Sequence, residues 1–441
     1  MCRSEWNIIE KIQPMLVGNE LREKLTIFPV YEDSVRNESQ AVRLLKLNNL
    51  HSFYLPSDMS VEIYTKLYLA MVRSIQKKEG KLAIRQRNIN GKRIKAYANG
   101  IEPSFEGVIG GSDSFSIIGC SGIGKTTAIS KAVQLMGGER IIEMEHPYYK
   151  IVPVINVQCP FDCSAKSMLL AILQKVDNAL GTNYYESTVR AKSNINTMLI
   201  STAQILLNHV AVLCIDEIQN LIKHRAGMQL VSMLTELLNE SGISIVFVGT
   251  PEIQPFFESV DYLARRTLGL TYGKCDYNDY FKEFCSKLWE FQFVSKRTEI
   301  TDGIINWLYQ HSSGTLAHVI FLFYTAQEIS ILDEREVIDV QALEAAYKRM
   351  ELLHMHIQPN VSLKRVAVKK KNKGSSVKVL AEAVEKKEEV SEKDSQIEEH
   401  ITNKGNAENW SFTELAKLSK QMQLDMVELL EDRVSVTEIT V

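Results

Sequence analysis

Between residues 115 and 126 the chain has the sequence Phe115-Ser-Ile-Ile-Gly-Cys-Ser-Gly-Ile-Gly-Lys-Thr126. From Gly119 onward it matches the phosphate-binding pattern GxxxxGK followed by Ser or Thr. The apolar run 115–118 predicts a strand that leads into this pattern, and the residues from Lys125 onward predict a helix that follows it. A glycine-rich turn with an accidental Lys-Thr pair is the alternative. The strand and helix on either side favour a P-loop, which binds the phosphates of a nucleotide.

A P-loop binds phosphate through backbone N–H groups that turn inward, which glycine permits, and through the positive end of the following helix. We therefore expect this loop to bind ATP, with Lys125 reaching the β and γ phosphates. The hydroxyl of Thr126 is expected to bind Mg²⁺. The expected nucleotide-binding residues are Gly119, Cys120, Ser121, Gly122, Ile123, Gly124, Lys125, Thr126, Thr127 and Asp216.

A second apolar run, at 210–215, ends in the acidic pair Asp216 and Glu217. Enzymes with parallel sheets place polar groups just beyond the C-terminal ends of their strands. We predict that Asp216 binds Mg²⁺ together with Thr126, and that Glu217 orients and polarises the water that attacks the γ-phosphate. A solvated turn is the alternative for an isolated acidic pair, but the position of this pair downstream of a P-loop favours catalysis.

A third apolar run, at 243–248, is followed by Gly249, Thr250 and Pro251. We expect Thr250 to contact the γ-phosphate or the attacking water, as the sensor I residue of AAA+ proteins does. A threonine that only begins a turn is the alternative. Arg265 and Arg266 follow where AAA+ proteins present an arginine finger to the nucleotide of a neighbouring subunit, a contact worth about 10³ to 10⁵ in rate in GTPases. An exposed arginine pair at a helix end is the alternative, and the choice between the two arginines stays open.

The pattern of apolar residues divides the chain into five segments. They are a mostly helical N-terminal domain at 1–111, an α/β ATPase core at 112–277, a helical lid at 278–357, a disordered charged linker at 358–409 and a short C-terminal helix at 410–441. The linker has too few apolar residues to offset its ordering entropy. The last helix, with a capping box at Ser411 and Glu414, either recognises a partner or packs on its own globular core.

The expected fold class is α/β, with a parallel sheet in the core. Short apolar runs that alternate with longer amphipathic stretches predict its strands at 115–118, 151–157, 210–215 and 243–248. Helical spacing of apolar residues predicts lid helices at 278–291, 300–311, 315–331 and 340–350.

Composition excludes several classes of protein. A net charge of −3 over 441 residues excludes a uniformly basic nucleic-acid coat. The seven cysteines lack the spacing of zinc ligands and are best explained as reduced thiols in a cytosol. We find no apolar run of the roughly 18 residues of a membrane helix and no signal-peptide pattern, so we expect a cytoplasmic protein without a membrane contact.

The segment 73–95 carries a strong local positive charge, with nine basic residues and one acidic residue. Several lysines and arginines together can neutralise DNA phosphates, and we find no motif that would read bases, so we expect contact with duplex DNA that is independent of sequence. The expected contacts are Arg85, Arg87, Lys92 and Arg93. A solvated helix and loop is the alternative.

The motifs together resemble those of the TnsC/TniB-type transposition ATPases, the AAA+ target-site regulators of heteromeric DNA transposons. The resemblance covers about residues 49–350 and includes the absence of a sensor II arginine at 311–318. It is also carried by Ile109-Gly-Gly-Ser-Asp-Ser-Phe-Ser-Ile-Ile118, Cys159-Pro-Phe-Asp-Cys-Ser164, Gly181-Thr-Asn-Tyr184 and Val248-Gly-Thr-Pro251. Without that arginine, we expect weak coupling between the lid and the nucleotide.

The resemblance implies a bacterial AAA+ ATPase with slow, switch-like hydrolysis. Such proteins form homo-oligomeric rings or helical filaments on duplex DNA in the ATP state, link a target-selecting protein to the transposase and disassemble on hydrolysis. It also implies that the N-terminal domain binds the target selector, that the C-terminal tail binds transposase subunits, and that Lys150 and Lys166 contact DNA. One alternative is a helicase loader or replication initiator, which would bind a helicase and single-stranded DNA. A scaffold NTPase is the other.

Overall fold

The computed structural model describes residues 12–99, 107–138, 141–145, 148–224, 226–258 and 269–357. The chain divides into two units, Met1–Pro359 and Asn360–Val441, and all described residues belong to the first. Arg265 and Arg266 lie outside the described residues, as do the predicted linker at 358–409 and the predicted C-terminal helix at 410–441.

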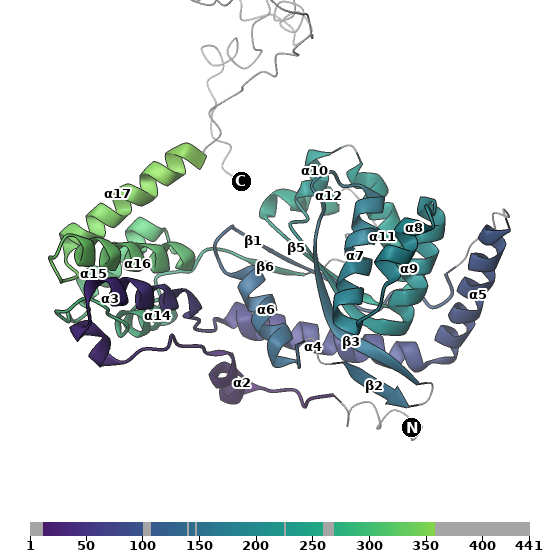
Figure 1. Cartoon of the computed structure of the whole chain (residues 1–441), viewed down its shortest axis with the longest axis horizontal. Helices are drawn as coiled ribbons and strands as arrows, with labels where there is room; N and C mark the ends of the chain where they lie inside the picture. Colours follow the sequence, from purple (N-terminus) through teal and green to yellow (C-terminus); the bar gives the residue numbers. More distant parts are fainter. Residues whose placement is uncertain are drawn as a thin grey trace, which may run out of the picture. The chain divides into compact units, whose positions relative to one another are not determined.

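A six-stranded sheet in the order β2-β3-β4-β5-β1-β6 forms the centre of the described core (Figure 1). The strands are β1 Phe115–Gly119, β2 Ile142–Glu145, β3 Tyr148–Gln158, β4 Val210–Asp216, β5 Ser244–Gly249 and β6 Leu270–Tyr272. All neighbouring strands are parallel except β2, which is antiparallel to β3. The four predicted strands are therefore confirmed. We did not predict β2, in which glutamate alternates with apolar residues, or β6, which has only three residues.

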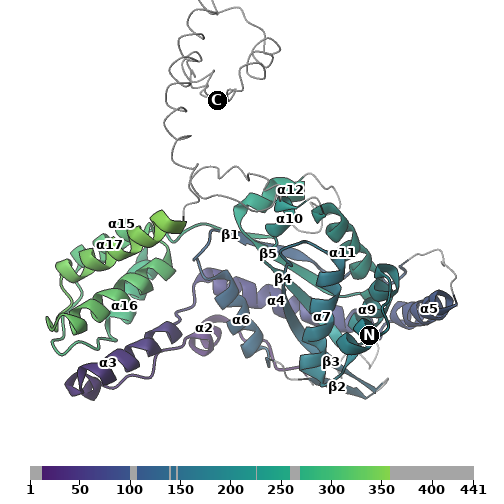
Figure 2. The ribbon, with the colours of Figure 1, turned by 45° about the horizontal axis from the view of Figure 1, so that its top comes forward.

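Helices cover both faces of the sheet because its strands are apolar on both sides. Along β4, Leu213 and Ile215 face one core, whereas Val212 and Cys214 face the other. The first face packs against α7 Ala165–Leu180, α9 Ile195–His209 and α11 Gly227–Ser241, and the second against α2 Gly18–Leu25, α4 Asp58–Glu79 and α6 Lys125–Leu135 (Figure 2). Shorter helices at the rim are α8 Tyr184–Arg190, α10 Asn220–Lys223, η3 Pro251–Ile253 and α12 Gln254–Glu258.

The lid consists of the four helices that the sequence predicts. They are α14 Asp279–Trp289, α15 Asp302–Ser312, α16 Leu316–Leu332 and α17 Val340–Ile357. Their apolar faces share one core, in which Phe281, Phe323 and Val319 are completely buried. Within the described residues no single helix is long and apolar enough to cross a membrane, although α15 and α16 reach that composition as a pair bent by 117°.

Within residues 1–111, which we predicted to form a mostly helical N-terminal domain, the described elements pack on the lid and on the sheet. An arm, residues 27–57, contains η1 Asp33–Asn37, α3 Gln40–Leu47 and η2 Asn48–Ser52, and its Leu47 and Leu50 are buried in the core of the lid. The next helix, α4, is buried against the sheet. Each of these elements is apolar on one side only and cannot enclose a core of its own, so their apolar faces complete the cores of the lid and of the sheet.

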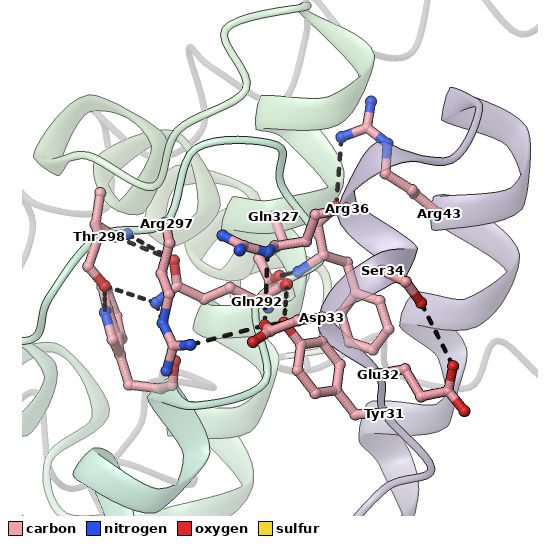
Figure 3. A network of polar contacts seen from close by, with 12 residues as sticks. Tyr31, Glu32, Asp33, Ser34, Arg36, Arg43, Gln292, Arg297, Thr298 and Gln327 are labelled. Atoms are coloured by element: carbon pink, nitrogen blue, oxygen red, sulfur yellow. Dashed lines mark hydrogen bonds and ion pairs between the residues drawn. The ribbon is translucent and has the colours of Figure 1, made fainter.

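Polar contacts also join the arm to the lid. The Tyr31 hydroxyl donates a hydrogen bond to the carbonyl oxygen of Gln292 over 2.9 Å, and Asp33 lies 3.7 Å from the guanidinium of Arg297 (Figure 3). Arg43 of α3 forms two hydrogen bonds with the carboxylate of Glu336. The last described N-terminal helix, α5 Lys81–Ala98, packs against α9 at the side of the core.

Candidate nucleotide-binding site

The P-loop and the two predicted catalytic segments meet at one edge of the sheet. Because β4, β5 and β1 are adjacent and parallel, their C-terminal residues Asp216, Gly249 and Gly119 lie at the same edge. A cavity of about 270 Å³, here called the phosphate pocket, opens there. Its lining consists of Ser121, Gly122, Gly124, Lys125, Thr126, Thr127, Asp216, Glu217, Gln219, Gly249, Thr250 and Ala317. The structure therefore brings together residues from all three predicted motifs.

Two glycines of the loop adopt a backbone conformation that few other residues reach. Gly122 and Gly124 have φ angles of +79° and +94°, in the left-handed region that glycine adopts without strain. The ammonium group of Lys125 donates hydrogen bonds to the carbonyl oxygens of Gly119 and Cys120 over 2.7 and 2.9 Å. Burial lowers the pKa of Lys125, while the nearby Asp216 and Glu217 act in the opposite direction. The ammonium group of Lys125 has a third N–H donor, which a bound phosphate would accept.

Thr126 and Asp216 fit a Mg²⁺ site. The Thr126 hydroxyl donates a hydrogen bond to Oδ2 of Asp216 over 2.7 Å, so the two oxygen donors predicted for the metal are already adjacent. Mg²⁺ prefers oxygen ligands and usually takes only one or two from the protein, the rest coming from water and substrate phosphates. These two residues would hold the metal beside the phosphates.

Hydrogen bonds join three residues at the ends of β4 and β5, two of which we predicted to be catalytic. Glu217 has a φ angle of +57°, an uncommon conformation for a residue with a side chain, and its carboxylate accepts a 2.5 Å hydrogen bond from Nε2 of Gln219. The other end of that amide, Oε1, accepts a 3.3 Å hydrogen bond from the backbone N–H of Thr250. The Thr250 hydroxyl is buried without a hydrogen-bond partner among the described residues. Buried polar groups usually have a partner, so this hydroxyl is available to a ligand.

A second cavity, of about 150 Å³, adjoins the phosphate pocket and shares Gly122, Gly124, Thr127 and Ala317 with it. We call it the base pocket. Its other lining residues are His51, Phe53, Tyr54, Leu55, Ser57, Met59 and Ser60 from the N-terminal segment, Ile123 from the loop, and Tyr280, Phe284, Leu316 and Ile320 from the lid. The Tyr54 and Tyr280 hydroxyls donate to Ser60 Oγ and to the Leu55 carbonyl, so both rings are fixed as walls. A flat heterocyclic base suits such walls.

Sequence reasoning missed the base pocket because its residues lie in three segments that are far apart in the chain. The sequence gives only weak signals for this pocket. One is the start of a helix at Ser57 and Ser60, and the other is the lid segment 311–318, which has no arginine. Ala317 stands in that segment and touches the loop through its backbone N–H, 3.4 Å from the Gly122 carbonyl oxygen. The lid thus contacts the P-loop through main-chain atoms.

The predicted DNA contacts separate into exposed and internal residues. The prediction for Arg93 is wrong, since its side chain is 6% exposed and forms a 2.9 Å ion pair with the buried Glu240. Arg87 also makes internal hydrogen bonds, to Oδ1 of Asn208 and to the Lys78 carbonyl. Arg85 and Lys92 are exposed. A run of basic residues in the sequence does not show which of their side chains face another helix or strand and which face solvent.

Lys150 and Lys166 do not form a common surface. Lys150 is near the beginning of β3 and lies 3.4 Å from the carboxylate of Glu143 in β2. Lys166 is exposed in the first turn of α7, which follows the other end of β3. The two therefore lie at opposite ends of the strand.

Comparison with known proteins assigns the core. Residues 110–257 match the family model of an AAA domain, whereas no curated protein matches the chain. Aeropyrum pernix ORC1, solved in complex with DNA, is 16% identical over 62% of this chain and 65% of its own length, with a TM-score of 0.41. The Walker-type ATPase PABY2304 of Pyrococcus abyssi is 12% identical over 70% of this chain and 83% of its own length, with a TM-score of 0.37.

Domain III of the Thermotoga maritima replication initiation protein DnaA is 17% identical over 61% of this chain and 92% of its own, with a TM-score of 0.35. Residues 110–257, which contain the P-loop and most of the parallel sheet, are therefore similar to an AAA domain, the domain of AAA+ ATPases. The described part of the chain combines this α/β domain with a helical lid and an N-terminal arm.

Proposed function

We propose that this protein binds and hydrolyses ATP with Mg²⁺ and uses the two nucleotide states as a switch. The observation that carries the proposal is the phosphate pocket, in which the loop, the Thr126–Asp216 pair and the Glu217–Gln219–Thr250 chain surround one space. The base pocket adjoins it and would hold adenine between the arm and the lid.

The roles of the residues follow from their positions. The loop N–H groups and Lys125 would bind the phosphates, and Thr126 and Asp216 would hold Mg²⁺, which neutralises charge on the phosphate oxygens. Glu217 would accept a hydrogen bond from the attacking water and orient it. The Thr250 hydroxyl would contact the γ-phosphate or that water. Lys125 is the one cation among the described lining residues, which favours an arginine from a neighbouring subunit, supplied by Arg265 or Arg266.

We further propose that the ATP state forms a homo-oligomer on duplex DNA and regulates transposition. The resemblance to TnsC/TniB-type ATPases supports this, as does the cationic face of α5, formed by the exposed residues Lys81, Arg85, Lys92 and Lys95. These residues lie at helical spacing on one side of α5. Within the same proposal, the N-terminal segment binds a target selector, residues 358–441 bind transposase subunits, and the setting is a bacterial cytoplasm.

Two substitutions test the ATPase. Lys125→Ala should weaken ATP binding by about 10- to 100-fold, because the phosphates lose a charged hydrogen-bond donor. Glu217→Gln should bind ATP normally but lower kcat by about 10² to 10⁴, because water activation is lost. Calorimetry and phosphate release would measure both, with Lys131→Ala on the same helix as the matched control. Normal hydrolysis by Glu217→Gln would refute the catalytic assignment.

Electron microscopy with duplex DNA and a non-hydrolysable ATP analogue tests the wider role. We expect oligomers that require both the analogue and duplex DNA. Binding to single-stranded DNA together with a hexameric helicase would instead identify a loader or initiator. If Arg265 or Arg266 acts across subunits, mixing its alanine variant with Lys125→Ala should restore part of the hydrolysis that each lacks alone.

A further inference from the structure

Gln219 occupies a position in the phosphate pocket that none of the motifs assigns. Its side chain joins the carboxylate of Glu217 to the backbone of Thr250, through a 2.5 Å hydrogen bond at Nε2 and a 3.3 Å hydrogen bond at Oε1. Gln219 is 8% exposed, so water competes little for these bonds.

The chemistry of its two neighbours allows only one orientation of this amide. The backbone N–H of Thr250 can only donate, so it must meet the carbonyl oxygen of the amide. The carboxylate of Glu217 accepts a hydrogen bond here, so it must meet the NH₂ group. The orientation of the amide thus follows from its two partners.

The surrounding backbone is shaped around the Gln219 side chain. A Cβ atom on Gly249 would come within 2.9 Å of Gln219 Oε1 and 2.7 Å of Ile218 Cγ2, so a larger residue at the end of β5 would displace the amide. The turn itself is fixed independently, because the N–H of Ile218 donates to the Val248 carbonyl oxygen over 3.0 Å and the N–H of Glu217 donates to Oδ1 of Asp216 over 2.8 Å. The amide is therefore not needed to close the turn.

We propose that Gln219 is a positioning residue that couples Thr250 to Glu217, an inference that rests on the proposed ATP hydrolysis. By binding Oε2 of Glu217, Gln219 leaves Oε1 to accept the hydrogen bond from the attacking water. A γ-phosphate that contacts the Thr250 hydroxyl displaces the N–H of the same residue. Because the amide of Gln219 is hydrogen-bonded to both residues, the Glu217 carboxylate moves with the Thr250 backbone. Glu217 is therefore placed to orient the attacking water when triphosphate is present.

Two substitutions at this position separate a coupling role from a purely structural one. Gln219→Leu keeps the approximate volume but removes both hydrogen bonds, and should lower kcat by about 10- to 100-fold while Kd for an ATP analogue changes less than about threefold. Gln219→Glu keeps the length of the side chain but replaces the NH₂ donor by an oxygen acceptor, so the hydrogen bond to Glu217 is lost. It should lower kcat at least as far as Gln219→Leu does, with a similarly small change in Kd.

The control is Gln327→Leu in the lid. Gln327 is also buried and also joins two backbone groups, the N–H of Phe293 and the carbonyl of Phe291, but it lies outside the phosphate pocket. It should lower Tm without the selective loss of kcat. Steady-state phosphate release, calorimetry and thermal unfolding of the full-length variants supply the readouts.

The outcomes are distinct. An unchanged kcat in Gln219→Leu, beside active unsubstituted protein, overturns the coupling role and leaves the ATPase intact. A loss of kcat that is matched by equal losses of affinity and Tm also overturns it. If the unsubstituted protein hydrolyses ATP no faster than Glu217→Gln, the proposed function fails and the inference fails with it.

Discussion

At the scale of single residues, two cations of the basic segment 73–95 stabilise the fold from within. Lys78 is completely buried, and its ammonium group donates hydrogen bonds to the carbonyl oxygens of Leu206, Leu207 and Ser241 over 2.7, 3.1 and 3.1 Å. These carbonyls end α9 and α11, where a positive charge is favourable. Burial lowers the pKa of Lys78 well below its usual value, but three acceptors at two helix ends favour the charged form.

Arg93 and its neighbour Lys92 form a matched pair for a stability test. Arg93→Met should lower the free energy of unfolding by about 3 to 5 kcal/mol at pH 8, because it leaves the buried carboxylate of Glu240 without a partner. Lys92→Met, at an exposed position one residue away, should change it by less than about 0.5 kcal/mol. Urea unfolding measures both. Equal stabilities would mean that the Arg93–Glu240 pair is not formed.

The same pair predicts how stability depends on pH. Burial raises the pKa of Glu240 to about 7, and the hydrogen bond from Arg93 only partly opposes it. Because this folded-state pKa lies above the usual value near 4.5, the contribution of Glu240 to stability is full below about pH 4.5 and is lost as the pH rises through 7. Glu240→Gln should therefore flatten the fall in unfolding free energy between pH 5.5 and 8, by no more than about 3 kcal/mol. An unchanged slope would contradict the assignment.

At the scale of elements, α5 presents two different faces. Ala83, Gln86, Asn90 and Arg93 are buried on one side, where Oε1 of Gln86 accepts hydrogen bonds from the N–H groups of Val108 and Ile109. The cationic face lies on the other side. The buried face fixes α5 on the core, so the exposed charges sit on a rigid element.

Substitution of all four residues of the cationic face by serine tests the proposed DNA contact. Duplex affinity should fall, and the log–log slope of affinity against salt should become shallower by about 0.9 for each phosphate that the protein no longer neutralises. ATP hydrolysis without DNA should not change. The control replaces Lys296 and Lys348, which are exposed on the lid. An unaltered slope would place the DNA-binding surface elsewhere.

At the scale of the described unit, the N-terminal segment links the lid to the ATPase core. The arm contributes Phe53 to the lid core, and α4, which follows the arm, packs against the sheet. The base pocket lies where the arm, the loop and the lid meet. Arg43 anchors the arm through Glu336, with one Nη2–Oε1 distance of 2.5 Å, and its side chain is 7% exposed. Nucleotide affinity should therefore depend on contacts far from the phosphates.

Arg43→Met should weaken ATP binding while kcat at saturating ATP stays within about twofold, because the arm shapes the base pocket whereas the hydrolytic residues lie on the core. Calorimetry and steady-state kinetics separate the two effects. Arg349→Met is the control, since it removes a 3.0 Å lid ion pair with Glu328 whose side chains are 51% and 35% exposed. Such exposed pairs contribute little. Equal effects of the two substitutions would refute the linking role of the arm.

The sequence alone determined the parts of this protein whose signal is local. The P-loop is contiguous, so its glycines, Lys125 and Thr126 are recognisable without a structure, and a buried parallel strand is a continuous apolar run. Helical spacing likewise predicted the four lid helices. Asp216, Glu217 and Thr250 followed because strand ends of a parallel sheet share one edge.

Only the tertiary structure decided how distant segments meet. Arg93 and Glu240 are 147 residues apart, and the arm reaches Glu336 across 293 residues. A lysine or arginine on a helix has the same local pattern whether it faces solvent, a carboxylate or the end of another helix. The base pocket, the hydrogen bonds of Gln219 and the division of the basic segment into exposed and internal cations depend on which elements pack together. Burial and hydrogen-bond partners are properties of the packed molecule.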